Sequence, residues 1–100
     1  MADVYEWDEA KRHTNLVKHG IDFVRMTEFD WARAAVVPDR RRDYGESRFR
    51  VYGMLGERFC VVAFTLRGGA YRIISVRRAS RAERSKYEQG RAEADRSRGR

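Results

Sequence analysis

Short apolar segments and helix-boundary residues alternate through the first third of the chain. Residues 4–7 form a candidate strand, and Asp8 is a typical N-cap for a helix that Gly20 ends in a left-handed turn. Asp22 can cap a second helix, which we expect to end near residue 31. Spacings of three and four residues predict the inward stripe of the first helix, which consists of Trp7, Ala10, Thr14 and Val17.

The middle of the chain has the spacing of β-strands. Alternation in residues 48–55 places Arg50 on the opposite face from Val51. Gly68 and Gly69 suit a tight hairpin that needs positive φ. The strand candidates are residues 34–38, 48–55, 59–66 and 71–76, and the last three are predicted to form a meander.

A last helix closes the predicted fold. Ser80 and Glu83 form a capping box, in which each side chain bonds the other residue's backbone amide. The class is therefore α+β: an antiparallel four-stranded sheet, or five-stranded if residues 4–7 join it, with two N-terminal helices and one C-terminal helix. We expect one domain over residues 1–90 and a basic flexible tail over residues 91–100, which lacks large apolar side chains.

The charge balance indicates an anionic partner. The chain has 22 Lys and Arg against 15 Asp and Glu, a net charge of +7. From Arg77 to Arg100 there are nine basic and four acidic residues, so this segment carries most of the excess. Such a balance is typical of nucleic-acid binding, although an acidic protein partner, or no anionic partner at all, also fits.

The same sequence gives no sign of disulfide, metal or membrane chemistry. Cys60 is the single cysteine and lies in an apolar run, so it is expected to be a buried hydrophobic residue in a reducing cytoplasm. His13 and His19 do not share a helix face, and no zinc-type spacing occurs, so no metal or other cofactor is expected. No signal peptide or membrane span is expected either.

Arginines at predicted strand ends are the main candidates for chemistry. Arg67 ends the central strand, and Arg77 and Arg78 end the return strand directly before the Ser80 cap. Guanidinium groups and a helix N-terminus both favour a phosphate, so we expect these side chains to converge on one. The alternative is a solvated basic face, and it is favoured for Arg81, Arg84 and Lys86.

Three other residues have two interpretations each. His19, near a helix C-terminus, can hold a raised pKa through the helix dipole and transfer protons, or can simply stabilise the last turn. Trp7 is a core residue or a platform for a stacked base. Glu57 lies in a tight turn and is a weak catalytic candidate.

Four blocks of this sequence resemble the BrnT toxin family, and together they cover about residues 5 to 88. The most specific motifs are Asn-Leu-x-Lys-His-Gly-x-x-Phe, from residue 15, and Ile-Ser-x-Arg-x-Ala-Ser-x-x-Glu-Arg, from residue 74. The four blocks are Trp7–Lys11, Asn15–Phe23, Gly45–Arg48 and Tyr71–Arg84.

The resemblance implies a RelE-like fold and a metal-independent endoribonuclease toxin that blocks translation in the cytoplasm. The implied partner is a BrnA-type ribbon-helix-helix antitoxin, in a complex of two toxins and two antitoxins that represses its own operon. Operator DNA is then bound only through the antitoxin, and RNA is the substrate. The residues proposed for catalysis are Arg67, Arg77, Arg78 and His19, those for substrate binding are Trp7, Lys18, Arg72 and Tyr71, and Glu57 is the weak candidate.

Two rival functions use the same charges. A basic binding module would hold an antitoxin or RNA without cutting it. A last helix that contacts duplex DNA directly would use Arg81, Arg84 and Lys86 and show a strong salt dependence. RNA cleavage by the purified protein in EDTA distinguishes the enzyme from both.

Overall fold

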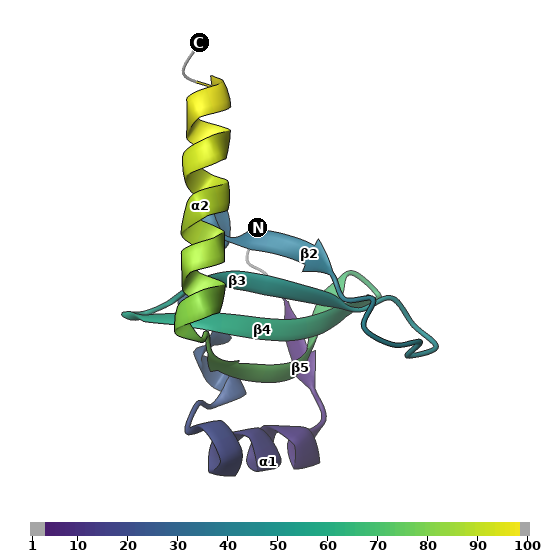
Figure 1. The fold of residues 1–100 in the computed structure, drawn as a ribbon. Coiled ribbons are helices and arrows are strands. Elements are labelled where there is room, and N and C mark those ends of the chain that lie inside the picture. Colours follow the sequence, from purple (N-terminus) through teal and green to yellow (C-terminus); the bar gives the residue numbers. More distant parts are fainter. Residues whose placement is uncertain (1–3, 99–100) are drawn as a thin grey trace.

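The sheet has five strands, and it lies between helices. The structure is a computed structural model that describes residues 4–98, with side chains described through residue 90. The strand order is β1-β5-β4-β3-β2 (Figure 1). The elements are β1 (Tyr5–Trp7), α1 (Glu9–His19), the 3₁₀ helices η1 (Phe23–Glu28) and η2 (Trp31–Arg33), β2 (Ala35–Pro38), β3 (Phe49–Leu55), β4 (Arg58–Arg67), β5 (Ala70–Arg78) and α2 (Arg81–Arg98).

The predicted meander is confirmed, but the sheet is mixed rather than antiparallel. β2, β3, β4 and β5 pair antiparallel in chain order, as hairpin connections require. β1 joins the free edge of β5 in parallel, with Tyr5 opposite Tyr71 and Trp7 opposite Ile73. The α+β class holds, while the all-antiparallel expectation is wrong, because β1 is separated from β5 by most of the chain and is free to run in the same direction.

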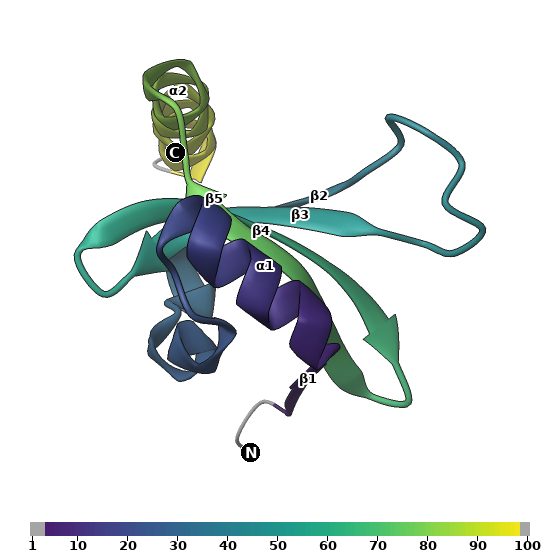
Figure 2. The ribbon, with the colours of Figure 1, turned by 90° about the horizontal axis from the view of Figure 1, so that it is seen from below.

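The helices cover opposite faces of the sheet. η1 and η2 lie on one side and α2 stands against the other, while α1 runs along the edge of β5 (Figure 2). The first side encloses the core, because its 3₁₀ helices supply Phe23 and Met26. We call the other side the open face. The strands contribute Val51, Leu55, Cys60, Val62, Phe64, Ile73 and Val76 to the core.

The predicted helix boundaries are mostly confirmed, but the second helix is not an α-helix. Asp8 accepts hydrogen bonds from the amides of the first turn of α1, and Gly20 ends that helix at φ 71°. Asp22 caps η1, yet two short 3₁₀ helices replace the expected single helix. Phe23 and Met26 are both buried, and a three-residue spacing matches the 3₁₀ repeat.

The predicted inward stripe of α1 is wrong. Val17 is 75% exposed, whereas Asn15 is 5% exposed. The Asn15 amide donates to the carbonyls of Val76 (2.9 Å) and Ile21 (3.0 Å), and its Oδ1 accepts from the Val76 amide (3.1 Å). α1 therefore docks through a polar side chain onto the edge of β5 beyond the end of β1, instead of through an apolar stripe onto a sheet face.

A β-bulge in β5 decides which side chains reach the open face. Ala63 pairs with Ser75 and Phe64 pairs with Ile73, so Ile74 is an extra residue. After the bulge the alternation is reversed. Val76 is consequently buried in the core, and Arg77 points to the open face.

α2 begins at the predicted capping box. The Glu83 carboxylate accepts from the Ser80 amide, and the Ser80 hydroxyl accepts from the Glu83 amide. The Tyr87 ring packs on Phe59 at 4.8 Å, and its hydroxyl donates to the Arg33 carbonyl. The helix continues to Arg98, through much of the expected tail (residues 91–100), whose mobility stays a prediction. Residues 99–100 of that tail lie outside the described part. No helix within residues 4–98 is long and apolar enough to cross a membrane.

Candidate functional site

A cationic groove runs between α1 and β5. Its volume is about 340 Å³. Asn15 forms its base, because its three hydrogen bonds hold the two elements together. The groove is lined by Ala10, Lys11, Thr14, Asn15, Lys18 and His19 of α1 and by Ile74 and Ser75 of β5.

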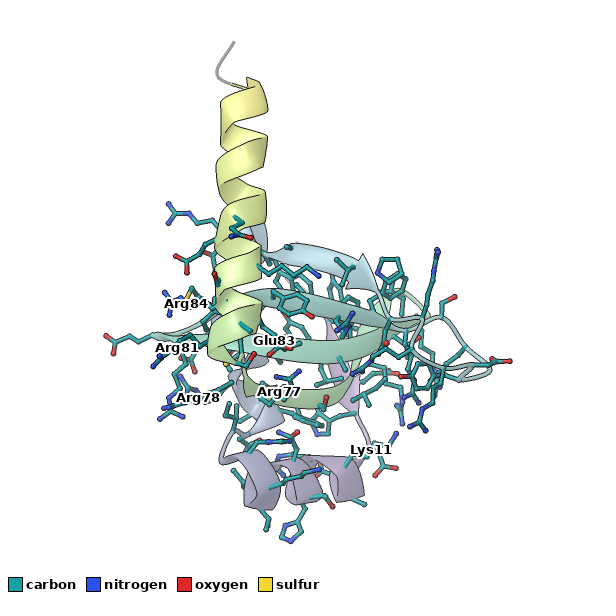
Figure 3. All side chains as sticks on the ribbon, in the orientation of Figure 1. Lys11, Arg77, Arg78, Arg81, Glu83 and Arg84 are labelled. Atoms are coloured by element: carbon teal, nitrogen blue, oxygen red, sulfur yellow. The ribbon has the colours of Figure 1, made fainter. Side chains whose placement is uncertain are left out.

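Arg77 lies near His19 and is paired with the first turn of α2. Its guanidinium donates to both carboxylate oxygens of Glu83, at 2.8 and 2.9 Å. Figure 3 shows the two side chains pointing toward each other where α2 meets β5. Hydrogen bonds from Arg77, and then the Ser80 amide, lower the pKa of Glu83 to about 2 despite partial burial. Glu83 is therefore a stable anion at neutral pH and a poor proton acceptor.

His19 is suited to accept a proton rather than to hold one. Its pKa is lowered from 6.5, first by burial and then by the positive charges of Lys18 and Arg77. Of the two interpretations of His19, the one that predicted a raised pKa is wrong, because burial and the two neighbouring cations lower it. The influence of Arg77 also shows that His19 and this guanidinium share one electrostatic environment.

The predicted convergence of three arginines is wrong. Arg67 pairs with Ala70 at one end of β4, whereas Arg77 lies opposite Val61, six residues back along that strand. At the usual rise per strand residue, that is about 20 Å. Arg67 is instead 3.4 Å from Glu46. Arg78 follows Arg77 directly and so points to the opposite face of the sheet.

The remaining predicted site residues lie outside the groove, apart from Lys18. Arg72 pairs with Glu6 at 3.3 Å on the adjacent strand. Tyr71 stacks on Trp31 at 4.5 Å on the core side. The other two are Trp7, which packs against Phe23, and Glu57, which lies in the exposed β3–β4 turn.

Lys11 and Ser75 are groove residues that the sequence pattern did not reveal, and Glu83 was expected only to cap a helix. A further unpredicted feature is that Tyr52 of β3 lies in one row across the sheet with Val61 and Arg77, on the open face. The alternation of residues 48–55 could have predicted which face of the sheet Tyr52 lies on. The bulge that brings Arg77 to the same face cannot be predicted from such a pattern.

Metal and thiol chemistry have no candidate site in the part of the chain that is described. There, no group of three or more His, Cys, Asp or Glu side chains is placed to hold a metal ion. Cys60 is buried, and that burial raises the pKa of its thiol. It fills the core as predicted.

A comparison with known protein families identifies a match. The family model described as "Ribonuclease toxin, BrnT, of type II toxin-antitoxin system" matches residues 7–83. The matched segment includes both walls of the groove and the Arg77–Glu83 pair. No curated protein shows significant similarity to the chain.

Proposed function

The chain belongs to the BrnT family of ribonuclease toxins of type II toxin–antitoxin systems, and we propose that it cuts RNA in the groove between α1 and β5. One observation carries this proposal: Lys11, Lys18 and His19 line a single groove, and Arg77 lies close enough for its charge to act on His19. Three of these side chains are cationic, and the fourth is a histidine whose pKa is lowered.

The proposed reaction transfers a phosphodiester to its own ribose 2′-hydroxyl. The 2′ oxygen forms a new bond to phosphorus, and the bond to the 5′ oxygen of the next nucleotide breaks. The proton of the 2′-hydroxyl passes to a base, and the leaving 5′ oxygen takes up a proton. The products are a 2′,3′-cyclic phosphate and a 5′-hydroxyl.

Each groove residue has a role in that scheme. Neutral His19 accepts the 2′-hydroxyl proton. Arg77 stabilises the charge that develops on the phosphoryl oxygens, after the phosphate displaces the Glu83 carboxylate from its guanidinium. Lys11 and Lys18, seven residues apart on α1, bind flanking phosphates.

The other predicted site residues have different places in the proposal. Arg67 and Arg72 contact the RNA backbone away from the cut, and Arg78 lies outside the catalytic centre. Trp7 and Tyr71 support the core instead of stacking on bases. The fold is proposed to be RelE-like, on the strength of its mixed sheet flanked by helices.

The decisive experiment is RNA cleavage by the purified protein in excess EDTA, because groove cations would replace a metal ion. Cleavage in EDTA that yields 2′,3′-cyclic phosphate ends supports the proposal. Cleavage that EDTA abolishes overturns metal independence. RNA binding without cleavage supports the binding module instead.

Family membership implies an antitoxin, and we propose that it is of the BrnA type with a ribbon-helix-helix domain. Two toxins and two antitoxins would form the complex, which represses its operon through the antitoxin alone. The free toxin would act in the cytoplasm and stop translation. Co-expression with the neighbouring reading frame, followed by mass measurement and operator binding with and without the antitoxin, tests this arrangement.

A further inference from the structure

Exposed arginines gather where β5 ends and α2 begins, outside the groove. Arg78 pairs across the sheet with Cys60, and the positive charges of Arg58 and Arg78 both act on the pKa of that thiol. The Arg84 guanidinium lies over the Phe59 ring at 5.3 Å. Figure 3 shows Arg78, Arg81 and Arg84 at the same end of β5, with Arg78 on the core side of the sheet and Arg81 and Arg84 on α2. Together with Arg58 they form what we call the arginine surface, which wraps around this end of the sheet.

The charge of this surface is largely uncompensated. Within the described residues, Arg58, Arg78 and Arg81 make no ion pair, and Arg84 reaches only the exposed Glu88, at 3.6 Å. Neighbouring like charges repel and lower stability. Guanidinium groups without an acidic partner favour a ligand with many phosphates, because each guanidinium can bind two oxygens of a phosphate.

The arginine surface continues the line of the groove. α1 runs beside β5, and the groove between them is lined from Lys11 to His19, on which the nearby Arg77 charge acts. In Figures 1 and 2, the C-terminal end of α1 and the first turn of α2 lie at the same end of β5. An RNA strand that leaves the groove past His19 therefore meets the arginine surface next.

The surroundings favour a nucleic acid over a protein. The core of a protein interface is apolar. None of the large apolar side chains that are exposed in the described part belongs to α2 or is adjacent in sequence to Arg58 or Arg78. Phe59 is covered by Arg84 and Tyr87. The arginine surface thus presents charge without an apolar centre.

We infer that the arginine surface binds backbone phosphates of the substrate RNA beyond the cleaved nucleotides, so that the toxin prefers strands long enough to span both sites. This inference rests on the proposed cleavage in the groove. It gives Arg78 a binding role outside the catalytic centre, and it makes α2 part of the RNA-binding surface.

The test uses a matched pair of double variants. Arg78→Gln/Arg81→Gln removes two charges from the arginine surface. Arg40→Gln/Arg42→Gln removes the same charge from the β2–β3 loop, where neither arginine makes an ion pair with a described residue. Cleavage is measured on a short RNA that fills only the groove and on a longer one that reaches α2. A 2′-O-methyl form of the longer RNA, which cannot be cut, gives the Kd.

We expect Arg78→Gln/Arg81→Gln to raise KM and Kd for the longer RNA about tenfold and leave kcat and the short RNA unchanged. The Arg40→Gln/Arg42→Gln control should behave like the parent. Equal effects of both variants, or none, overturn the inference, as does a loss of antitoxin binding with RNA affinity intact. If the parent binds the longer RNA through this surface but cuts neither RNA, only the proposed cleavage fails.

Discussion

The Arg77 side chain already holds an anion in the geometry that a phosphodiester needs. Its two bonds to Glu83, at 2.8 and 2.9 Å, show both donor groups of the fork engaged. A phosphate in the groove would compete with Glu83 for the same donors. The positive charge of the guanidinium would then stabilise the negative charge that develops on the phosphate in the transition state. We therefore expect Arg77→Ala to lower kcat/KM for RNA by about 10²-fold and to relieve growth arrest on overexpression.

A second bidentate pair in the same protein provides the control. Arg25 donates to both oxygens of Glu28 at 3.1 and 3.2 Å, on η1 at the other side of the sheet. Arg25→Ala removes a comparable surface ion pair, worth at most about 1 kcal/mol, and should leave cleavage unchanged. If both variants lose activity equally, the effect of Arg77 is on stability and its proposed role fails.

His19 gives the reaction a predictable pH dependence. Because its folded-state pKa lies below 6.5, the imidazole is neutral at pH 7 and becomes protonated only under more acidic conditions. As a proton acceptor it should make kcat/KM fall as pH drops through that lowered pKa. His19→Gln should abolish this acidic limb, the fall of kcat/KM at low pH, and should lower the rate at pH 7 by about 10²-fold.

The matched variant is His13→Gln, which changes an exposed residue of the same helix. It should retain both the rate and the acidic limb of the parent profile. An acidic limb that persists in His19→Gln would mean that another group accepts the proton.

At the scale of the element, α1 depends on one amide for its place beside β5. Asn15→Leu would leave the Val76 amide and carbonyl and the Ile21 carbonyl without their partner. Buried groups left unpaired cost about 1–3 kcal/mol, so we expect the free energy of unfolding in urea to fall by at least about 2 kcal/mol. Val17→Ser, at a position 75% exposed, should change it by less than about 0.5 kcal/mol. Similar losses in both variants would contradict this account of how α1 is held.

Local signals predicted the element boundaries, while the contacts between elements escaped prediction. Caps at Asp8 and Ser80 and the glycine hairpin depend on a few adjacent residues, and all are present. The docking of α1 through Asn15 and the bulge at Ile74 depend on partners far along the chain. The bulge in particular is indistinguishable in sequence from continued alternation, because Ile73 and Ile74 are both apolar.

The error over Arg67 has a different origin, since the sequence contained the means to avoid it. Arg67 ends one strand and Arg77 ends the next, and the Gly68-Gly69 hairpin makes those strands antiparallel. When two neighbouring strands are antiparallel, the C-terminal end of one lies beside the N-terminal start of the other, so their C-terminal ends are a full strand length apart. The groove itself was partly anticipated, because Lys18 and His19 belong to a block that resembles the family.

At the scale of the whole molecule, the question is whether the net charge of +7 or its placement attracts RNA. Long-range attraction of RNA depends on the total charge of the protein. In contrast, each phosphate that a side chain neutralises releases its own counterions. For single strands, the slope of log affinity against log salt falls by about 0.7 for each phosphate that the protein no longer neutralises. Lys11 and Lys18 line the groove, so each should neutralise one phosphate.

We expect Lys11→Gln/Lys18→Gln to reduce that slope by about 1.4, measured by titrating 2′-O-methyl RNA at several salt concentrations. Arg40→Gln/Arg42→Gln carries the same net charge as this variant but changes the β2–β3 loop, so its slope should match that of the parent. Equal reductions in the two variants would mean that RNA responds to total charge and that the groove does not hold the strand. A reduction confined to the lysine variant would place phosphates along α1, beside the histidine that is proposed to start the cleavage.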